Sequence, residues 1–485
     1  MITEHALKSL KHIVGSDCFL DSEEDKIAYS YDATPLLHQR PEAILIPHTP
    51  LQISQILQLA NEEKFAVVPR GTGSGLSGGS IPVENSVVLL MSHWDKILEI
   101  DSANLTTWVE PGVITGKLHS SVEEVGLFYP PDPGSAAICT IGGNVAENAG
   151  GLRGLKYGVT KNYVMGMEVV LPTGEIIVIG GKSTKDVAGY NLKDFLVGSE
   201  GTLGVFTRIL LKLIPKPDTS QTMLVFFDKM SDAADTVSDI IASKITPAAL
   251  EFLDQTTIKC VEEFAHLGLP TTIEAILMIE VDGRASMVEE DVVAIQSICE
   301  RHRPVNFKVA STKEEAAKLR SARKVAFSAL ARVRPTTILE DATVPRSEVP
   351  AMLEKIHGIA SNYSLLFGIF GHAGDGNLHP TCLTDERDND EITRTHKAFD
   401  EIFSAAVGYG GTITGEHGTG LAKKQFFEKI AGPAQIGMMR SIKASIDPNS
   451  ILNPGKIFSL SPRCEGSMPR SKDQIAKFAD MGAFT

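Results

Sequence analysis

Between residues 43 and 91 the chain alternates strand-like apolar runs with one run of helical spacing. Thr49 and Pro50 supply an N-cap and a first helical residue, and Gln52 completes a capping box. Apolar residues then recur at helical spacing at Ile53, Ile56, Leu57 and Ala60. Three apolar runs predict short buried strands: 43–46, 65–68 and 87–91. A strand, a capped helix and a second strand therefore lead into a glycine-rich segment.

Past residue 215 the pattern changes. The proline-rich stretch 215–218 is typical of a domain boundary. After it, strand-like runs at 223–227 and 275–281 alternate with amphipathic helical runs at 287–299 and 349–360. Such alternation favours an antiparallel sheet covered by helices. Two further runs predict helices near the C-terminus: 402–407 and 433–446. The pattern predicts an α+β protein.

Composition narrows the class of protein. A chain of 485 residues exceeds one ordinary core and should form two or more domains. The net charge of −14 argues against nucleic acid and anionic membranes as main partners. Residues 1–15 lack the continuous apolar core of a signal peptide, and no apolar run is long enough to span a membrane. The six cysteines form no CxxC pair, which excludes a ferredoxin-type module in this chain and fits a reducing cytoplasm.

The glycine-rich segment 71–80 holds five glycines and four hydroxyl residues. Its backbone N–H groups can converge on one point, which predicts a phosphate cradle. A nicotinamide-type dinucleotide fingerprint would need a crossover helix, but only eight residues including Pro82 separate Gly78 from the strand at Val87. A P-loop would need a lysine after the last glycines, and none follows. A plain glycine-rich surface turn is the remaining alternative.

Two more glycine-rich blocks follow, at 130–151 and 198–205. The three blocks in this order resemble the flavoprotein superfamily with a vanillyl-alcohol-oxidase-type (PCMH-type) FAD-binding domain. The resemblance implies that the first loop wraps the FAD pyrophosphate, the second follows the flavin and ribityl chain, and the third approaches the adenine. Some members attach FAD to a histidine in the first loop; residues 69–80 contain none, so we expect non-covalent FAD. The implied FAD-binding residues are Pro69, Arg70, Gly71, Thr72, Gly73, Ser74, Gly75, Pro131, Asp132, Ser135, Gly142, Gly143, Asn148, Gly201, Val205 and Asn453.

A second block carries candidate chemistry. The stretch 372–380 reads HAGDGNLHP, and GEHG follows at 415–418. Two histidines and one glutamate can bind a divalent metal and leave positions open for substrate. We expect zinc, while manganese or iron also fit this ligand set. The alternative is that these are separate polar loop residues.

From about residue 40 to 458 the chain resembles the FAD-linked D-2-hydroxy-acid dehydrogenases, a family that includes D-lactate dehydrogenases and glycolate oxidase FAD subunits. The resemblance implies that His417 is the catalytic base and that Asn377 lies beside the substrate. Arg323 matches a carboxylate-binding arginine, with Arg332 as a second candidate; either could instead lie on a solvated helix face. The residues matching the metal ligands are His372, His379 and Glu416.

One departure bears on the substrate. Two residues before Asp341, the D-2-hydroxyglutarate enzymes carry a lysine for the distal carboxylate, and this chain has Leu339. Burying an unpaired carboxylate beside a leucine is costly. We therefore expect D-lactate or glycolate as substrate, with electrons passed to a protein or quinone acceptor. D-2-hydroxyglutarate oxidation, an electron-transfer subunit of a larger oxidase and a non-redox alkyl-glycerone-phosphate synthase are the alternatives.

The same resemblance predicts the domain organisation. We expect a PCMH-type FAD-binding domain, an antiparallel-sheet-and-helix substrate (cap) domain and C-terminal helices. The predicted boundaries are a helical lead-in at 1–37, the FAD domain at 38–217, the cap domain with the metal site at 218–420, a helical segment at 421–458 that returns to the FAD domain, and a polar tail at 459–485.

Overall fold

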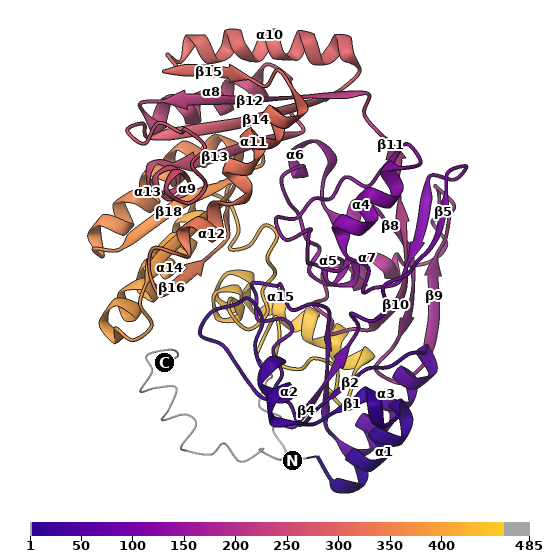
Figure 1. Ribbon diagram of the computed structural model, residues 1–485. Coiled ribbons are helices and arrows are strands. Elements are labelled where there is room, and N and C mark those ends of the chain that lie inside the picture. The colour runs from indigo at the N-terminus through magenta and orange to yellow at the C-terminus, as the bar shows by residue number, and fades with distance from the viewer. Residues whose placement is uncertain (1, 460–485) are drawn as a thin grey trace.

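In the computed structural model, which describes residues 2–459, the first half of the chain builds two main sheets and a small two-stranded one (β7 and β11), and the second half builds one larger sheet (Figure 1). The two halves form separate lobes, and the last helix lies between them (Figure 1). Of the predicted tail at 459–485, residues 460–485 lie outside the described residues. Within the described residues, no helix is long and apolar enough to cross a bilayer.

The first sheet has the strand order β1-β2-β4-β3, with β2, β4 and β3 parallel and β1 antiparallel to β2. Helix α3 begins as predicted: the Thr49 hydroxyl accepts a hydrogen bond from the Gln52 N–H, and Pro50 is the first helical residue. No helix links the parallel strands β3 and β4, because the glycine-rich loop makes that connection. The bounds are α1 Glu4–Val14, β1 Phe19–Leu20, α2 Glu23–Ala28, β2 Ala43–Leu45, α3 Pro50–Glu63, β3 Ala66–Arg70 and β4 Ser86–Leu90.

The N-terminal segment belongs to this core. Leu10 and Val14 of α1 pack with Ile53 and Leu57 of α3, and β1, a strand that the sequence did not predict, extends the sheet.

The second sheet is antiparallel, with the order β5-β6-β10-β8-β9. The glycine-rich blocks two and three lie on loops and short helices beside it. The bounds are β5 Ile97–Asp101, β6 Thr106–Val109, α4 Thr115–Glu123, β7 Leu127–Phe128, α5 Ile141–Glu147, α6 Gly154–Tyr157, β8 Val164–Val170, β9 Ile176–Gly180, α7 Leu192–Leu196, β10 Val205–Lys212 and β11 Ile214–Pro215.

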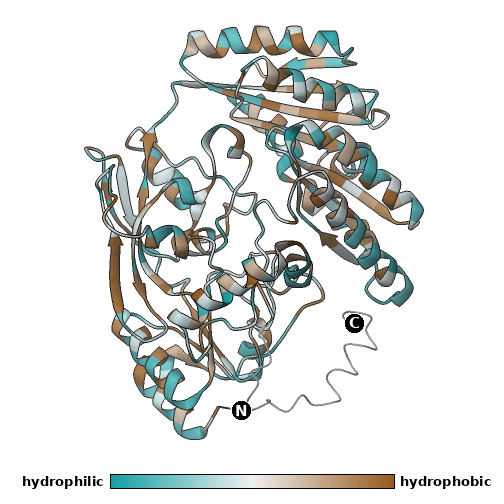
Figure 2. Ribbon diagram, turned by 180° about the vertical axis from the view of Figure 1, so that it is seen from behind, coloured by the Kyte–Doolittle hydropathy of each residue, from teal (hydrophilic) through white to brown (hydrophobic). Residues whose placement is uncertain are grey.

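The second lobe is an antiparallel sheet with the path β15-β12-β14-β13-β18-β19-β16, and β17 pairs with β19. Strand side chains alternate between two cores: Val225 packs in the core with α8, α10, α13 and α14, while Phe226 packs in the core with α9, α11 and α12. Apolar residues follow the sheet strands, and polar residues mark the outer faces of the helices (Figure 2). Helices on both faces of an antiparallel sheet agree with the predicted pattern.

The strands of this lobe are β12 Thr219–Phe227, β13 Ala249–Asp254, β14 Ala275–Gly283, β15 Asn306–Val309, β16 Thr336–Leu339, β17 Ala342–Thr343, β18 Leu366–His372 and β19 Asn377–Thr384. Its helices are α8 Met230–Ala242, α9 Gln255–Ala265, α10 Ala285–Arg301, α11 Lys313–Lys324, α12 Ala326–Leu330, α13 Val349–Asn362 and α14 Asn389–Gly408.

Helix α15 (Lys424–Ile446) connects the lobes. It breaks at Gly432, whose φ is +72°, just before Pro433. Phe426, before the break, packs on the second lobe, and Ile442, after it, packs on the first. The chain then bonds to β3, because Asn453 N–H donates to the Val67 carbonyl.

Candidate functional site

The hairpin of β18 and β19 brings the two predicted histidine ligands together. His372 lies opposite Asn377, and Phe370 lies opposite His379, so these four side chains share one face of the hairpin. Glu416 joins them from the loop after α14: its Oε1 lies 3.1 Å from His372 Nε2 and 3.3 Å from His379 Nε2. One ligand atom from each residue lies within 4.8 Å of the others. This donor set and spacing fit one divalent cation.

His417 stacks on this cluster. Its ring lies parallel to that of His379, with centroids 5.1 Å apart, and its Nε2 lies 4.0 Å from Glu416 Oε1. Its other nitrogen, Nδ1, is buried and makes no hydrogen bond to a described residue. Nε2 therefore faces the cluster.

Asp341 fixes the loop that carries Glu416 and His417. Its Oδ2 accepts hydrogen bonds from the Thr414 hydroxyl and from three successive backbone N–H groups, those of Gly415, Glu416 and His417, at 2.8–3.1 Å. Asp341 is fully buried, so these charge-assisted bonds are made without competing water.

Glu251 and Arg323 form a second layer behind His372. Glu251, on β13, accepts from His372 Nδ1 at 2.7 Å and from Arg323 Nε at 2.6 Å. The Arg323 guanidinium lies 4.6 Å from the Phe370 ring centroid. The predicted carboxylate-binding arginine and a predicted metal ligand are thus joined through one buried carboxylate.

The electrostatics of the cluster follow from these contacts. Burial acts to raise the pKa of the Glu416 carboxyl, but His372 and His379 outweigh it and lower the pKa well below its ordinary value. Burial likewise opposes the raised pKa of His372, which Glu251 and Glu416 hold well above its ordinary value. Burial lowers the pKa of His417 to about 4, so its imidazole is neutral at pH 7.

The cluster lies against the first lobe. A Cβ at Gly150, in the second glycine-rich block, would approach Glu416 Oε2 to 2.7 Å, and one at Gly418 would meet the carboxylates of Glu147 and Glu200. Glu200 also accepts hydrogen bonds from the backbone N–H groups of Thr419 and Gly420. The metal-type cluster and the glycine-rich blocks therefore meet at one junction.

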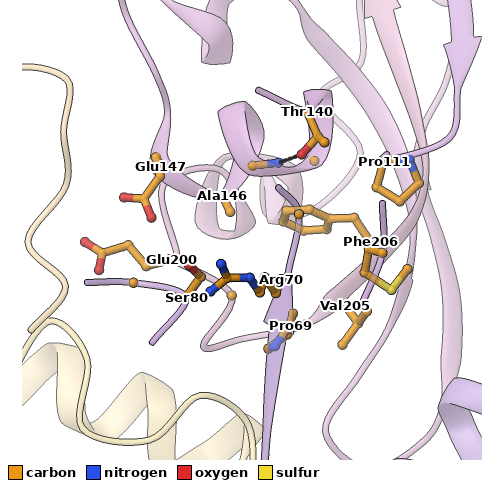
Figure 3. A pocket seen from close by; sticks show the side chains of 17 residues that line it. Pro69, Arg70, Ser80, Pro111, Thr140, Ala146, Glu147, Glu200, Val205 and Phe206 are labelled. Carbon is orange, nitrogen blue, oxygen red and sulfur yellow. Dashed lines mark hydrogen bonds between the residues drawn. The ribbon is translucent and has the colours of Figure 1, made fainter. Parts of the chain in front are cut away.

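A cavity opens in the first lobe beside this junction (Figure 3). Glu147 and Glu200 lie at one end and the apolar side chains of Val205 and Phe206 at the other, with Arg70 between them (Figure 3). The cavity is lined by Pro69, Arg70, Gly71, Gly79, Ser80, Met91, Pro111, Thr140, Gly142, Gly143, Ala146, Glu147, Glu200, Gly201, Gly204, Val205 and Phe206.

The cavity fits an anionic dinucleotide. Nε and Nη1 of Arg70 are buried and make no hydrogen bond to a described residue. This cation in the cavity wall therefore has hydrogen-bond donors available for a ligand. The loops also approach closely: a Cβ at Gly71 would clash with the Thr140 hydroxyl, which explains glycine there. A diphosphate would satisfy the free donors of Arg70.

The predicted cofactor residues divide into two groups. Those that line the cavity are Pro69, Arg70, Gly71, Gly142, Gly143, Gly201 and Val205. Those that do not line it are Thr72, Gly73, Ser74, Gly75, Pro131, Asp132, Ser135, Asn148 and Asn453. Members of the second group make structural bonds: the Thr72 hydroxyl donates to the Ile138 carbonyl, Asn148 Oδ1 accepts from the Lys161 N–H, and Asn453 Nδ2 donates to the Gly79 and Glu200 carbonyls.

Of the three predicted substrate-binding residues, two lie at the histidine cluster and one does not. Arg323 is buried against the cluster, and Asn377 lies on its hairpin face with Oδ1 buried and without a hydrogen bond to a described residue. Arg332 is exposed, and its guanidinium lies 5.3 Å from the Phe264 ring centroid. The structure does not bring Arg332 to the cluster.

Sequence reasoning missed four acidic residues of the site. Glu251 had one available signal, a lone charged residue within the apolar run 249–253. Glu147 and Glu200 lay inside recognised glycine-rich blocks but were not singled out, and Asp341 served only as a position marker for Leu339.

A cavity with free cationic donors, beside a histidine and carboxylate cluster, fits an enzyme that binds an anionic cofactor and a metal ion. Two family models agree with it: residues 41–180 match "FAD binding domain", and residues 216–457 match "FAD linked oxidases, C-terminal domain".

Curated relatives cover nearly the whole chain. The glycolate oxidase subunit GlcD of Bacillus subtilis (strain 168) is 52% identical over 463 residues, 96% of this chain and 98% of the relative. GlcD of Escherichia coli (strain K12) is 37% identical, covering 94% and 91%. The D-lactate dehydrogenase of Anaerostipes hadrus is 34% identical, covering 92% and 94%. The chain belongs to the family of FAD-linked oxidases and is an FAD-linked oxidoreductase.

Solved structures support the fold. Substrate-bound p-cresol methylhydroxylase matches with a TM-score of 0.77 at 19% identity, covering 94% of this chain and 97% of that one. An alkyldihydroxyacetonephosphate synthase matches with a TM-score of 0.73 at 19% identity, covering 93% and 84%. These likenesses concern the fold alone. The predicted α+β, PCMH-type FAD-binding fold is confirmed.

Proposed function

We propose that the protein oxidises a small D-2-hydroxy acid, glycolate or D-lactate, to the 2-oxo acid, using non-covalent FAD and one divalent metal ion. The observation that carries this proposal is the convergence of His372, His379 and Glu416 at 3.1–3.3 Å, next to the loop that also carries His417. The relatives named glycolate oxidase subunit and D-lactate dehydrogenase support the substrate class.

His372, His379 and Glu416 would hold the metal, and Arg70 with the glycine loops would hold the FAD diphosphate. When bound, FAD supplies the electron acceptor and the metal supplies Lewis acidity toward the substrate oxygens. Zinc, manganese and iron all suit two histidines and one carboxylate, and we favour zinc.

The chain's own residues bind the substrate and move its proton. Arg323 suits the substrate carboxylate, because Glu251 occupies only its Nε and leaves both terminal nitrogens for a bidentate contact. His417 takes the hydroxyl proton at Nε2, the nitrogen that faces the cluster. Asp341 Oδ2, at 3.9 Å from Nδ1, stabilises the resulting imidazolium. With the hydroxyl proton held at His417 Nε2, the hydrogen on Cα would leave with its electron pair as a hydride, for which bound FAD would be the two-electron oxidant, and the 2-oxo acid would form.

The surroundings of Arg323 favour a monocarboxylate. Leu339 is 8% exposed and packs in the same apolar cluster as Phe370, the ring beneath Arg323. A second carboxylate placed among these side chains would lose its hydration without a partner. D-2-hydroxyglutarate is the alternative substrate, and it would require another cation nearby.

Two relatives are named as subunits, so we also propose that electrons leave through a partner protein or a quinone rather than a nicotinamide. An electron-transfer subunit without its own substrate site is the alternative. Anaerobic mixing with glycolate, D-lactate, L-lactate and D-2-hydroxyglutarate tests both, with flavin absorbance as the signal. Rapid bleaching by glycolate or D-lactate is expected; no bleaching by any acid would favour the electron-transfer alternative.

A further inference from the structure

Glu251 links two functional groups that belong to different elements. It lies on β13, where the next residue, Phe252, pairs with Gly371 of β18, so Glu251 is a cross-strand neighbour of His372. One carboxylate oxygen lies 2.7 Å from His372 Nδ1, and the other lies 2.6 Å from Arg323 Nε on α11. The carboxylate is fully buried, and each of its oxygens pairs with a basic side chain. The two oxygens of Glu251 therefore bind two different site residues, His372 and Arg323.

A neighbouring ion pair shows what a purely structural arrangement looks like here. Arg320 lies three residues before Arg323 on the same helix, and its Nη1 lies 3.0 Å from Glu280 Oε2 on β14. Glu280 shares its oxygen with the Thr222 hydroxyl and contacts no residue of the histidine cluster in the described structure. Glu251 and Glu280 thus pair with the same helix from adjacent strands, but only Glu251 reaches a proposed ligand.

We propose that Glu251 is the positioning residue that prepares both halves of the substrate site. By accepting the hydrogen bond from Nδ1, it would hold the proton of His372 on that nitrogen when a metal is bound and leave Nε2, the nitrogen 3.1 Å from Glu416 Oε1, as the metal-binding atom. By binding Nε of Arg323, it fixes the guanidinium plane and presents the two terminal nitrogens to a carboxylate. The inference rests on the proposed function, because it assumes that the cluster binds a metal.

The test compares Glu251→Gln with its matched control, Glu280→Gln, in full-length flavoprotein stripped of metal. Zinc affinity is measured by competition with a chromophoric chelator. Loss of such an outer carboxylate weakens metal binding by about 10–100-fold, which is expected for Glu251→Gln. Glu280→Gln should bind zinc like the parent protein, and both variants should retain FAD. Binding of oxalate, followed in metal-free protein by the change in flavin absorbance, should also weaken in Glu251→Gln alone, because Arg323 loses its support.

The outcomes distinguish failure of the metal site from failure of the role of Glu251. If the parent protein binds no zinc, the metal site of the proposed function fails. If the parent binds zinc and Glu251→Gln binds it and oxalate equally well, the metal site stands and the role of Glu251 is overturned.

A measurement on the unaltered sequence covers the case in which Glu251→Gln does not fold. In zinc-loaded protein labelled with ¹⁵N-histidine, the His372 signal, identified by its loss in His372→Gln, should show a protonated Nδ1. A deprotonated or metal-bound Nδ1 would contradict the proposal.

Discussion

Asp341 Oδ2 lies 3.1 Å from the backbone nitrogen of His417 and 3.9 Å from its ring Nδ1, so one buried carboxylate contacts both the main chain and the imidazole of the proposed base. Burial would raise the pKa of Asp341, but His417 and Lys423 outweigh it and keep the carboxyl ionised. The same oxygen also holds the N–H of the proposed ligand Glu416. Asp341 therefore ties the position of the base to that of the metal.

Asp341→Asn should slow flavin reduction while sparing FAD binding. Removing a nearby negative charge lowers the proton affinity of an imidazole by about 1–2 pKa units, so a roughly 10–100-fold loss in the reduction rate is expected. Stopped-flow absorbance in the absence of oxygen measures it. Asp390→Asn, at an exposed carboxylate on α14, is the control and should reduce at the parent rate. A parent-like rate in Asp341→Asn would show that the proton is accepted elsewhere.

The pH dependence of the reaction follows from His417. Burial lowers its pKa to about 4, so Nε2 is available as a base throughout the neutral range. Protonation of His417 should therefore leave the rate of flavin reduction unchanged above about pH 6 and should lower the rate only as the pH approaches 4.

The pH dependence of protein stability should also reflect the lowered pKa of His417. The unfolded histidine titrates near 6.5 and binds more protons than the folded one between that pH and about 4, so the free energy of unfolding falls as the pH drops through this window.

His417→Asn should reduce the flavin about 10²–10⁴-fold more slowly than the parent enzyme and should lack the acidic limb of the rate profile. A limb that survives in His417→Asn would assign it to another group.

Removing the metal ion and removing one of its proposed protein ligands should both abolish substrate oxidation. His379→Ala, or chelator treatment of the parent protein, should abolish substrate oxidation and leave FAD bound, because the ligands come from the second lobe and the FAD cavity from the first. Metal content by mass spectrometry and flavin absorbance measure the two independently. His396→Ala, on the exposed face of α14, controls for loss of a histidine. Full activity in metal-free protein would exclude the Lewis-acid role.

The sequence predicted the parts of this site whose spacing is local. His372 and His379 come from one hairpin, and its HxGDGNxH pattern places them on one face, while GEHG supplies two adjacent site residues. The contributions of β13 and α11 depend on long-range pairing that the local pattern does not encode. Arg323 was the first candidate for the substrate carboxylate and Arg332 the second, but local sequence could not show that the first is buried against Glu251 and the second is exposed near Phe264.

The first strand and the last helix also show that a local pattern cannot predict every element. β1 has two residues, too few for a detectable alternation, and it forms because β2 offers a free edge. The run 433–446 was correctly predicted as helix, but the preceding turns of α15 were not, because Gly432 and Pro433 interrupt the pattern there.

Arg70 provides a test of the FAD site. Its replacement by methionine removes the buried cation with free donors that lines the cavity. The dissociation constant of FAD, measured by fluorescence quenching on titration of apoprotein, should rise by about 10-fold or more, since a charge-assisted hydrogen bond contributes roughly 1.5–3 kcal/mol. In the parent protein, acid precipitation should release all FAD to the supernatant. Flavin that stays with the precipitated chain would contradict non-covalent binding.

Leu339 provides the sharpest test of substrate choice. It lies at the end of β16, 8% exposed, two residues before Asp341 and in the apolar cluster that includes Phe370. The parent enzyme should therefore have a higher kcat/KM for glycolate or D-lactate than for D-2-hydroxyglutarate, whose second carboxylate would lack a partner. Leu339→Lys should reverse this preference by supplying that partner, and a buried charge pair typically changes discrimination by about 10-fold or more.

The lysine should also reduce stability in the absence of substrate, because its ammonium group is buried unpaired, and D-2-hydroxyglutarate should restore part of the loss in a thermal unfolding assay. Leu339→Met, which keeps the apolar volume, should retain the parent preference. If the parent enzyme already prefers D-2-hydroxyglutarate, another cation serves the distal carboxylate and the monocarboxylate proposal is wrong. If Leu339→Lys folds and its preference is unchanged, the substrate chain extends away from β16.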